Sequence, residues 1–79
     1  MSIRVRLSFL LMKYVPGYDP DAGMLLDGAE DETAAEIIER LGIPPGEVVT
    51  IMVNAYPARP ESVVKDGDSV TLTKIIGGG

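Results

Sequence analysis

The chain has 79 residues, and its 12 acidic and 7 basic side chains leave a formal net charge of -5 at pH 7. This balance argues against nucleic acid as a partner, because phosphate binding draws on an excess of Lys and Arg. The sequence contains neither cysteine nor histidine, which excludes disulfides, thiolate zinc sites and Ser–His or Cys–His pairs. Its longest apolar run, residues 9–12, is far shorter than the roughly 18 residues that span a bilayer. We therefore expect one small, soluble, cytoplasmic domain that binds neither nucleic acid nor a membrane.

The first predicted element is a half-buried strand over residues 2–9. Apolar and polar side chains alternate there without a break, which is the period-2 pattern of a strand with one face in the core. Residues 10–23 contain Pro-Gly and Asp-Pro steps and predict a surface loop, with a short helical turn as an option at residues 10–12. A short second strand over residues 24–26 precedes an Asp-Gly turn. The inward side chains of the first strand are predicted to be Ile3, Val5, Leu7 and Phe9.

The clearest local element is a helix over residues 33–41. Thr33 and Glu36 have the spacing of a capping box. Gly42 supplies a C-terminal stop, and the Pro-Pro pair that follows prevents continuation. Apolar residues recur at the i, i+3, i+4 and i+7 spacing of one helix face, namely Ala34, Ile37, Ile38 and Leu41.

The remaining part of the chain predicts three more strands. Residues 48–53 are rich in β-branched side chains, and the Asn-Ala pair that follows can turn the chain. A short return strand begins at Tyr56, and two nearby prolines confine it to the edge of the sheet. The turn over residues 65–68 leads into a last strand over residues 69–73, with Val70 and Leu72 directed inward. The order ββαβββ predicts a single α+β domain.

The last residues of the sequence are Gly77, Gly78 and Gly79. A frayed terminus is the simplest explanation. Alternatively, three such residues extend about 10 Å and, without Cβ atoms, fit a channel too narrow for other side chains. The reactive group on such a tail is the α-carboxylate, which is ionised at neutral pH because its unperturbed pKa is about 3.3 to 3.7. A carboxylate resists nucleophilic attack until a step such as ATP-dependent adenylation activates it.

Several short motifs occur in an order that resembles the ubiquitin-like sulfur carriers of the MoaD and ThiS type. They are Val53-Asn54, the run Val-Lys-Asp-Gly-Asp-Ser-Val-Thr-Leu at residues 64–72, and the terminal glycines. Eleven residues follow Asp68, a spacing similar to that of the molybdopterin-synthase small subunit, and this places the family's Gly-Gly pair on Gly78 and Gly79. Further counterparts in the family are found for residues 9–13, 27–29 and 37–43.

This resemblance implies a β-grasp fold, in which a mixed sheet wraps around one main helix and the first strand lies beside the last. The β-grasp domain would cover residues 1–76, and the glycine tail residues 77–79. The implied role is that of a carrier rather than an enzyme. An activating enzyme uses ATP to adenylate Gly79, a sulfur donor converts it to a thiocarboxylate, and Gly77 and Gly78 allow passage of the tail.

The resemblance also implies what receives the sulfur. The acceptor would be a synthase large subunit or an equivalent enzyme, in the biosynthesis of the molybdenum or tungsten cofactor. The chain itself would bind no cofactor and no metal.

Two departures from the family pattern and three alternatives stay open. Lys74 and the residue after it stand where the molybdopterin branch usually has prolines. Gly77 adds a third glycine, so Gly77 and Gly78 would be the functional pair if Gly79 were trimmed.

Thiamine-pathway carriers tend to be shorter, so the long segment over residues 10–23 favours the MoaD type. A protein modifier conjugated through Gly79 would use the same tail, whereas a non-covalent interaction domain would use none of this chemistry.

A partner interface is predicted beside the tail. Ile75 and Ile76 are the candidates for apolar contact, and Lys74, Arg4 or Arg6 would orient that contact through charge. For the two arginines, plain solvent exposure on a strand is the simpler interpretation.

A second apolar cluster either packs under the long loop or faces a partner; its members are Leu10, Leu11, Met12 and Tyr14.

Four aspartates, Asp19, Asp21, Asp66 and Asp68, suggest a calcium site. Neither pair lies in a 12-residue EF-hand loop that ends in glutamate. We therefore expect turn chemistry, in which these carboxylates accept hydrogen bonds from nearby backbone groups.

Overall fold

The computed structural model describes residues 2–28, 31–48 and 50–74. Within these residues the strands and the α-helix follow the predicted order ββαβββ. Two short 3-10 helices are added to it, one after the first strand and one after the α-helix. The elements are β1 (Ser2–Leu7), η1 (Phe9–Tyr14), β2 (Met24–Asp27), α1 (Ala34–Arg40), η2 (Pro45–Glu47), β3 (Thr50–Val53), β4 (Tyr56–Ala58) and β5 (Ser69–Thr73).

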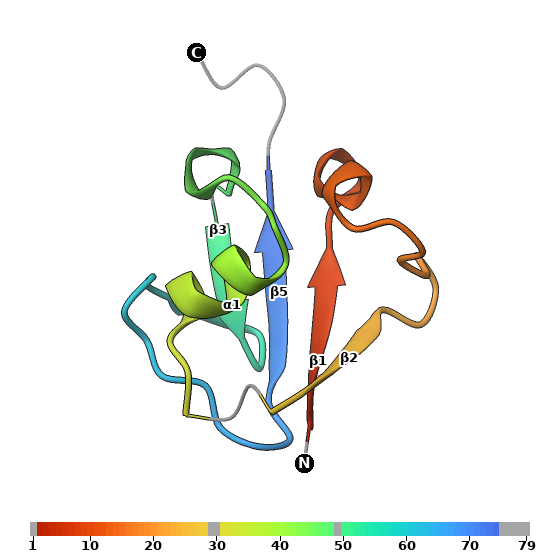
Figure 1. Ribbon diagram of the computed structural model, residues 1–79. Coiled ribbons are helices and arrows are strands. Elements are labelled where there is room, and N and C mark those ends of the chain that lie inside the picture. Colours follow the sequence, from red (N-terminus) through yellow and green to blue (C-terminus); the bar gives the residue numbers. More distant parts are fainter. Residues whose placement is uncertain (1, 29–30, 49, 75–79) are drawn as a thin grey trace.

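The strands form a mixed sheet in the order β2-β1-β5-β3-β4, so the last strand of the sequence lies at its centre. β5 pairs in parallel with β1 and antiparallel with β3. The two outer pairs, β1 with β2 and β3 with β4, are antiparallel. Figure 1 shows α1 crossing one face of this sheet. A mixed sheet that holds one helix, with the first strand beside the last, is the β-grasp arrangement, and that prediction is confirmed.

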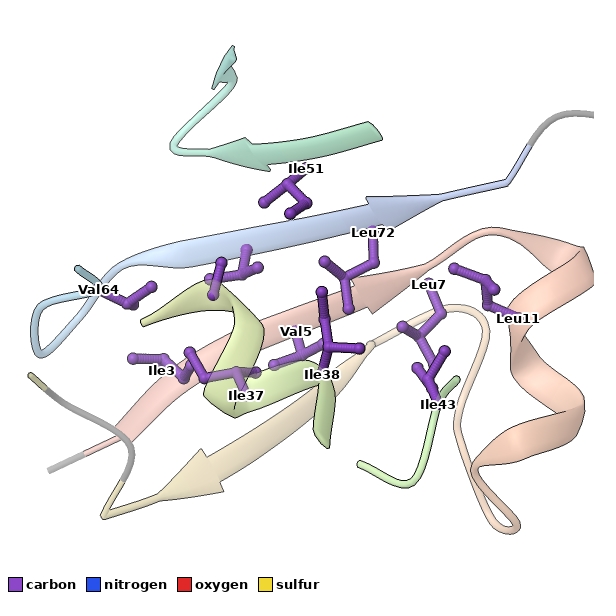
Figure 2. Packing of buried hydrophobic residues seen from close by; sticks show 12 residues of the cluster. Ile3, Val5, Leu7, Leu11, Ile37, Ile38, Ile43, Ile51, Val64 and Leu72 are labelled. Carbon is purple, nitrogen blue, oxygen red and sulfur yellow. The ribbon is translucent and has the colours of Figure 1, made fainter. Parts of the chain in front are cut away.

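The hydrophobic core lies between α1 and the sheet (Figure 2). In the parallel β1–β5 register, Val5 pairs with Val70 and Leu7 with Leu72, which places four buried side chains on one face. This follows from the alternation of each strand, because side chains two residues apart share a face. The predicted helix stripe covers them, with Ala34, Ile37 and Ile38 buried and Leu41 half-buried. The remaining buried members are Ile3, Leu11, Ile43, Ile51 and Val64.

The ends of α1 are formed as the sequence predicts. The backbone N–H of Glu36 donates to the Thr33 hydroxyl at 3.2 Å, and the Thr33 N–H donates to the Glu36 carboxylate at 2.8 Å. This reciprocal pair satisfies two backbone donors that the first turn leaves free. Beyond the last turn, Gly42 has a φ of +79°, a backbone conformation that glycine adopts without steric cost.

The first strand is shorter than predicted, and Phe9 is not a core residue. β1 ends at Leu7, and Phe9 begins η1 with 75% of its surface exposed. The chain turns at Ser8, whose carbonyl accepts the N–H of Leu11 at 3.0 Å. Leu11, in the same helical turn, is the fully buried residue of this segment. The helical option at residues 10–12 is confirmed, and it extends to Tyr14.

The β3–β4 hairpin confirms the predicted turn and edge strand. Asn54 and Ala55 have φ values of 53° and 69°, the left-handed conformation required at both central residues of a tight hairpin turn. β4 pairs with β3 alone and contains Pro57, which cannot donate to a further strand.

None of the helices in the part of the chain that the structure describes is long and apolar enough to cross a membrane. The predicted boundary between domain and tail, at residues 76 and 77, lies outside the described residues.

The packing predicts that two leucine truncations have very different costs. Leu72 is fully buried beneath the helix, whereas Leu25 is 61% exposed. Leu72→Ala should lower the free energy of unfolding by roughly 2 to 5 kcal/mol, because it removes buried methyl groups and leaves a cavity. Leu25→Ala is the matched control, and we expect a change within about 0.5 kcal/mol. Urea denaturation of the three proteins measures both values, and equal unfolding midpoints would contradict the assigned core.

Candidate functional site

The candidate site lies where the central strand ends. Lys74, directly after β5, is held by two contacts. Its backbone N–H donates to the Ser8 hydroxyl at 3.1 Å, and its ammonium group forms an ion pair with Glu47. The Tyr14 hydroxyl donates to the same Glu47 carboxylate at 3.0 Å. We call these four residues, Ser8, Tyr14, Glu47 and Lys74, the tail-root cluster.

Each member of the tail-root cluster comes from a different part of the fold. Ser8 joins β1 to η1, Tyr14 is the last residue of η1, and Glu47 is the last residue of η2. Figure 1 shows η1 and η2 on the two sides of the end of β5. A second anchor on β1 is the Tyr18 hydroxyl, which accepts the Leu7 N–H at 2.9 Å. The sheet and both 3-10 helices therefore fix the position from which the chain continues.

The ion pair determines the protonation of its two members. The hydrogen bond from Lys74 and then the one from Tyr14 hold the pKa of Glu47 below its usual value of 4.5. The same Glu47 carboxylate raises the pKa of Lys74 above its usual value of 10.5. Both groups are therefore charged throughout the neutral range. Because the two side chains keep 30% and 31% of their surface exposed, water screens the pair, and its main effect is to orient the Lys74 side chain.

The charged groups of the tail-root cluster are engaged with one another. Its carboxylate is ionised and engaged by two donors, and its ammonium group is protonated and paired. Neither group is available as a general base or a nucleophile near pH 7.

Three of the predicted interface residues lie in the part of the chain that the structure describes, and they occupy two different places. Lys74 belongs to the tail-root cluster and turns toward Glu47. Arg4 and Arg6 are exposed and alternate with the buried Ile3, Val5 and Leu7 on β1, so they lie on the sheet face that points away from the core. The Arg4 guanidinium donates to the Ala22 carbonyl at 2.6 Å. The other interface and tail residues predicted from the sequence lie outside the described residues; they are Ile75, Ile76, Gly77, Gly78 and Gly79.

Ser8 and Glu47 were not predicted from the sequence as members of this site. Ser8 lies 66 positions from Lys74 in the sequence, and Glu47 lies 27 positions from it. No local pattern connects residues at such separations. The sequence contained one signal for this site. Lys74 continues the alternation that directs Val70 and Leu72 inward, and a cation at the border of a core needs a carboxylate as a partner.

The predicted turn chemistry is confirmed for Asp19 and Asp68, whose carboxylates accept nearby backbone N–H groups. The Asp66 carboxylate accepts a distant backbone N–H instead, and Asp21 donates its own N–H. The Asp68 carboxylate accepts the Lys65 N–H at 2.8 Å and the Asn54 side-chain amide at 2.9 Å. Asp66 accepts the Ser2 N–H at 2.9 Å, and Asp19 accepts the Asp21 N–H at 2.8 Å. Among the described residues, no three acidic side chains gather in a geometry that would hold a metal ion.

Comparison with known proteins places the domain in a family. The family model described as Mut7-C ubiquitin matches residues 1–74, a range that ends at Lys74. A search of curated proteins and a search of solved structures found no match.

The shifted pKa values predict that the free energy of unfolding depends on pH, and that Glu47→Gln removes this dependence. A carboxyl group with a lowered pKa contributes stability above its unfolded pKa, and this contribution is lost as the pH falls through the folded value. The wild type should therefore exceed Glu47→Gln in stability at pH 7, and this difference should shrink below about pH 4.5, the usual Glu value. Lys74, whose pKa is raised, contributes below its unfolded pKa and loses that contribution only in strong alkali.

Denaturant unfolding at pH 7 and pH 3 measures this difference. Glu61→Gln is the matched control, because Glu61 is exposed and makes no ion pair with the described residues. A Glu47→Gln difference that stays constant between the two pH values would show that the ion pair does not hold the tail root.

Proposed function

The chain belongs to the Mut7-C ubiquitin family, and from its ubiquitin-like fold we propose that it is a sulfur carrier of the MoaD and ThiS type. In this proposal the folded domain is a handle, and the α-carboxylate of Gly79 is the group that reacts. The favoured pathway is molybdopterin biosynthesis, with molybdenum or tungsten as the final metal.

The observation that supports this proposal best is the anchoring of Lys74 at the end of the central strand. The backbone N–H and the side chain of Lys74 are both engaged, the first by Ser8 and the second by Glu47. Five residues follow Lys74 in the sequence, and the last three are glycines. A carrier needs a fixed base and a slender, reactive end, and the tail root together with this sequence meets both needs.

The proposed chemistry takes place in three steps. A carboxylate oxygen of Gly79 attacks the α-phosphorus of ATP, pyrophosphate leaves, and an acyl adenylate forms. A sulfur donor at the oxidation level of sulfide then attacks the acyl carbon, and AMP leaves, so that the product is a thiocarboxylate. Transfer of this sulfur to an acceptor, with water supplying an oxygen atom, returns the carboxylate.

The catalysts for these steps are assigned to partners. The chain has no histidine and no cysteine, and the titratable groups of the tail-root cluster are engaged in holding Lys74. The proposed partners are an activating enzyme that binds ATP, a sulfur donor, and a synthase large subunit or an equivalent acceptor enzyme. In this scheme the chain is a carrier and a substrate, not an enzyme.

A second candidate function is a non-covalent interaction domain. The observation that favours it is the extent of the family match, which ends at Lys74 and so does not include the glycines. A protein modifier that is conjugated through Gly79 and a thiamine-pathway carrier remain alternatives that use the same tail.

One isolation experiment separates these functions. The protein is tagged at its N-terminus, purified from its own cells under denaturing conditions, and examined by intact-mass and peptide mass spectrometry. A sulfur carrier predicts a chain that ends at Gly79 and is heavier by the difference between one sulfur and one oxygen atom. Abundant branched peptides that join Gly79 to lysine, without any thiocarboxylate, would favour the modifier. A chain that carries neither would favour the interaction domain.

The glycine tail predicts a specific effect of Gly78→Val. The valine side chain should leave the unfolding midpoint unchanged, because the buried core residues of the described chain end at Leu72, and it should block entry into a narrow activating site. ATP–pyrophosphate exchange by the activating enzyme measures the block. Gly46→Val is the matched control, because a Cβ atom at Gly46 meets no heavy atom within 4 Å. Normal exchange with Gly78→Val would contradict the requirement for a slender tail.

A further inference from the structure

The surface of η1 carries an apolar hollow that the proposed function does not use. Phe9, Leu10, Met12 and Lys13 line it, and its volume is about 390 Å³. We call these four residues the η1 hollow. Phe9 is 75% exposed there, although burial of an aromatic ring is one of the larger apolar gains available to a protein.

The helical geometry of η1 separates the core-facing side chains from the hollow. A 3-10 helix has three residues per turn, so residues three apart share a face. Leu11 is fully buried and Tyr14 half-buried, and together they form the face that meets the core. Phe9 and Met12 share a second face, and Leu10 and Lys13 a third. Met12 is half-buried and also packs against the core. Phe9 is therefore the apolar side chain of η1 that the described core leaves most exposed.

A positive charge borders this apolar surface. The Lys13 ammonium group lies 5.2 Å from the centre of the Tyr14 ring. It makes no ion pair with any described carboxylate, whereas Arg40, Lys65 and Lys74 each make one. In a protein with a net charge of -5, the η1 hollow is thus an apolar surface with a local positive charge. Charge complementarity selects a partner that places a carboxylate beside an apolar side chain.

The two ends of η1 are both connected to Lys74. Ser8, which precedes η1, accepts the Lys74 N–H at 3.1 Å. Tyr14, which ends η1, donates to Glu47, and Glu47 pairs with the Lys74 ammonium group. A protein seated on the η1 hollow is thereby held at a fixed position relative to the start of the tail.

We propose that the η1 hollow is the docking site for a protein segment that carries an apolar side chain beside a carboxylate. This segment belongs to the enzyme that acts on the tail, an assignment that rests on the proposed function. Phe9 is the aromatic anchor of the contact, and Lys13 sets its orientation.

The chemistry of the partner is tested first, with peptides. The acetylated, amidated peptide Asp-Leu-Phe-Glu and its charge-reversed form Lys-Leu-Phe-Lys are titrated into the full chain, and amide resonances are followed by NMR. The acidic peptide should cause saturable shifts centred on Phe9, Leu10, Met12 and Lys13, and the basic peptide should bind at least about tenfold more weakly. Equal binding of the two peptides, or no saturable shift at the η1 hollow, would overturn the docking site.

The link to the tail is tested in cells with a matched pair of variants. Phe9→Asp changes the η1 hollow. Tyr56→Asp changes an aromatic ring on the edge strand β4 that is 74% exposed, close to the 75% of Phe9. If the wild type and the two variants have equal unfolding midpoints, Phe9→Asp should carry a thiocarboxylate fraction at least about tenfold lower than the wild type. Tyr56→Asp should not change this fraction.

The remaining outcomes separate the two proposals. If the wild type and both variants carry the thiocarboxylate equally, the proposed function stands and docking of the tail enzyme at the hollow is refuted. If the wild type carries none, the proposed function fails, as does the assignment of the segment to a tail enzyme. In that case the peptide titration alone decides whether the η1 hollow is a docking site.

Discussion

The structure depends on the burial of β5 at the centre of the sheet. Val70 and Leu72 are fully buried, and the backbone of this strand pairs with β1 on one side and with β3 on the other. Burial of each such side chain contributes roughly 1.5 to 3 kcal/mol, a large share of the stability of a domain of this size. Since β5 is the last strand of the sequence, the domain cannot complete its core without fixing the residue that starts the tail. Folding of the sheet therefore also fixes Lys74, the last residue that the structure describes.

From this constraint follows the division of roles among the residues around Lys74. The sheet sets the position of that residue, and Ser8 and Glu47 set the direction of its backbone and side chain. The side chains of Glu47 and Lys74 are 31% and 30% exposed, so their ion pair contributes to orientation more than to stability. Beside it, η1 supplies one face to the core and leaves an apolar surface with a lysine at its border. The described part of the chain thus places the fixed end of β5 next to an exposed apolar surface.

The sequence predicted what local patterns determine. The alternation of residues 69–73 and the capping box of Thr33 and Glu36 each act within a few positions, and both are confirmed. Phe9 was placed wrongly because alternation alone does not show where a strand ends, and the turn at Ser8 substitutes Leu11 in the core. The tail-root cluster was missed because its contacts join residues 27 and 66 positions apart. Such contacts are created by the topology of the sheet and have no periodic signature.

The central claim is that the start of the tail is held by the same cooperative unit as the core. Native-state hydrogen exchange of the Lys74 and Leu72 backbone amides tests it most directly. The Lys74 N–H donates to Ser8 at 3.1 Å, directly after the strand that contains Leu72, so both amides should exchange through the same large opening. We predict protection of Lys74 within about tenfold of that of Leu72, with equal dependence on denaturant. Exchange of the Lys74 amide at the rate of an unstructured peptide, while Leu72 stays protected, would contradict a tail root held by the core.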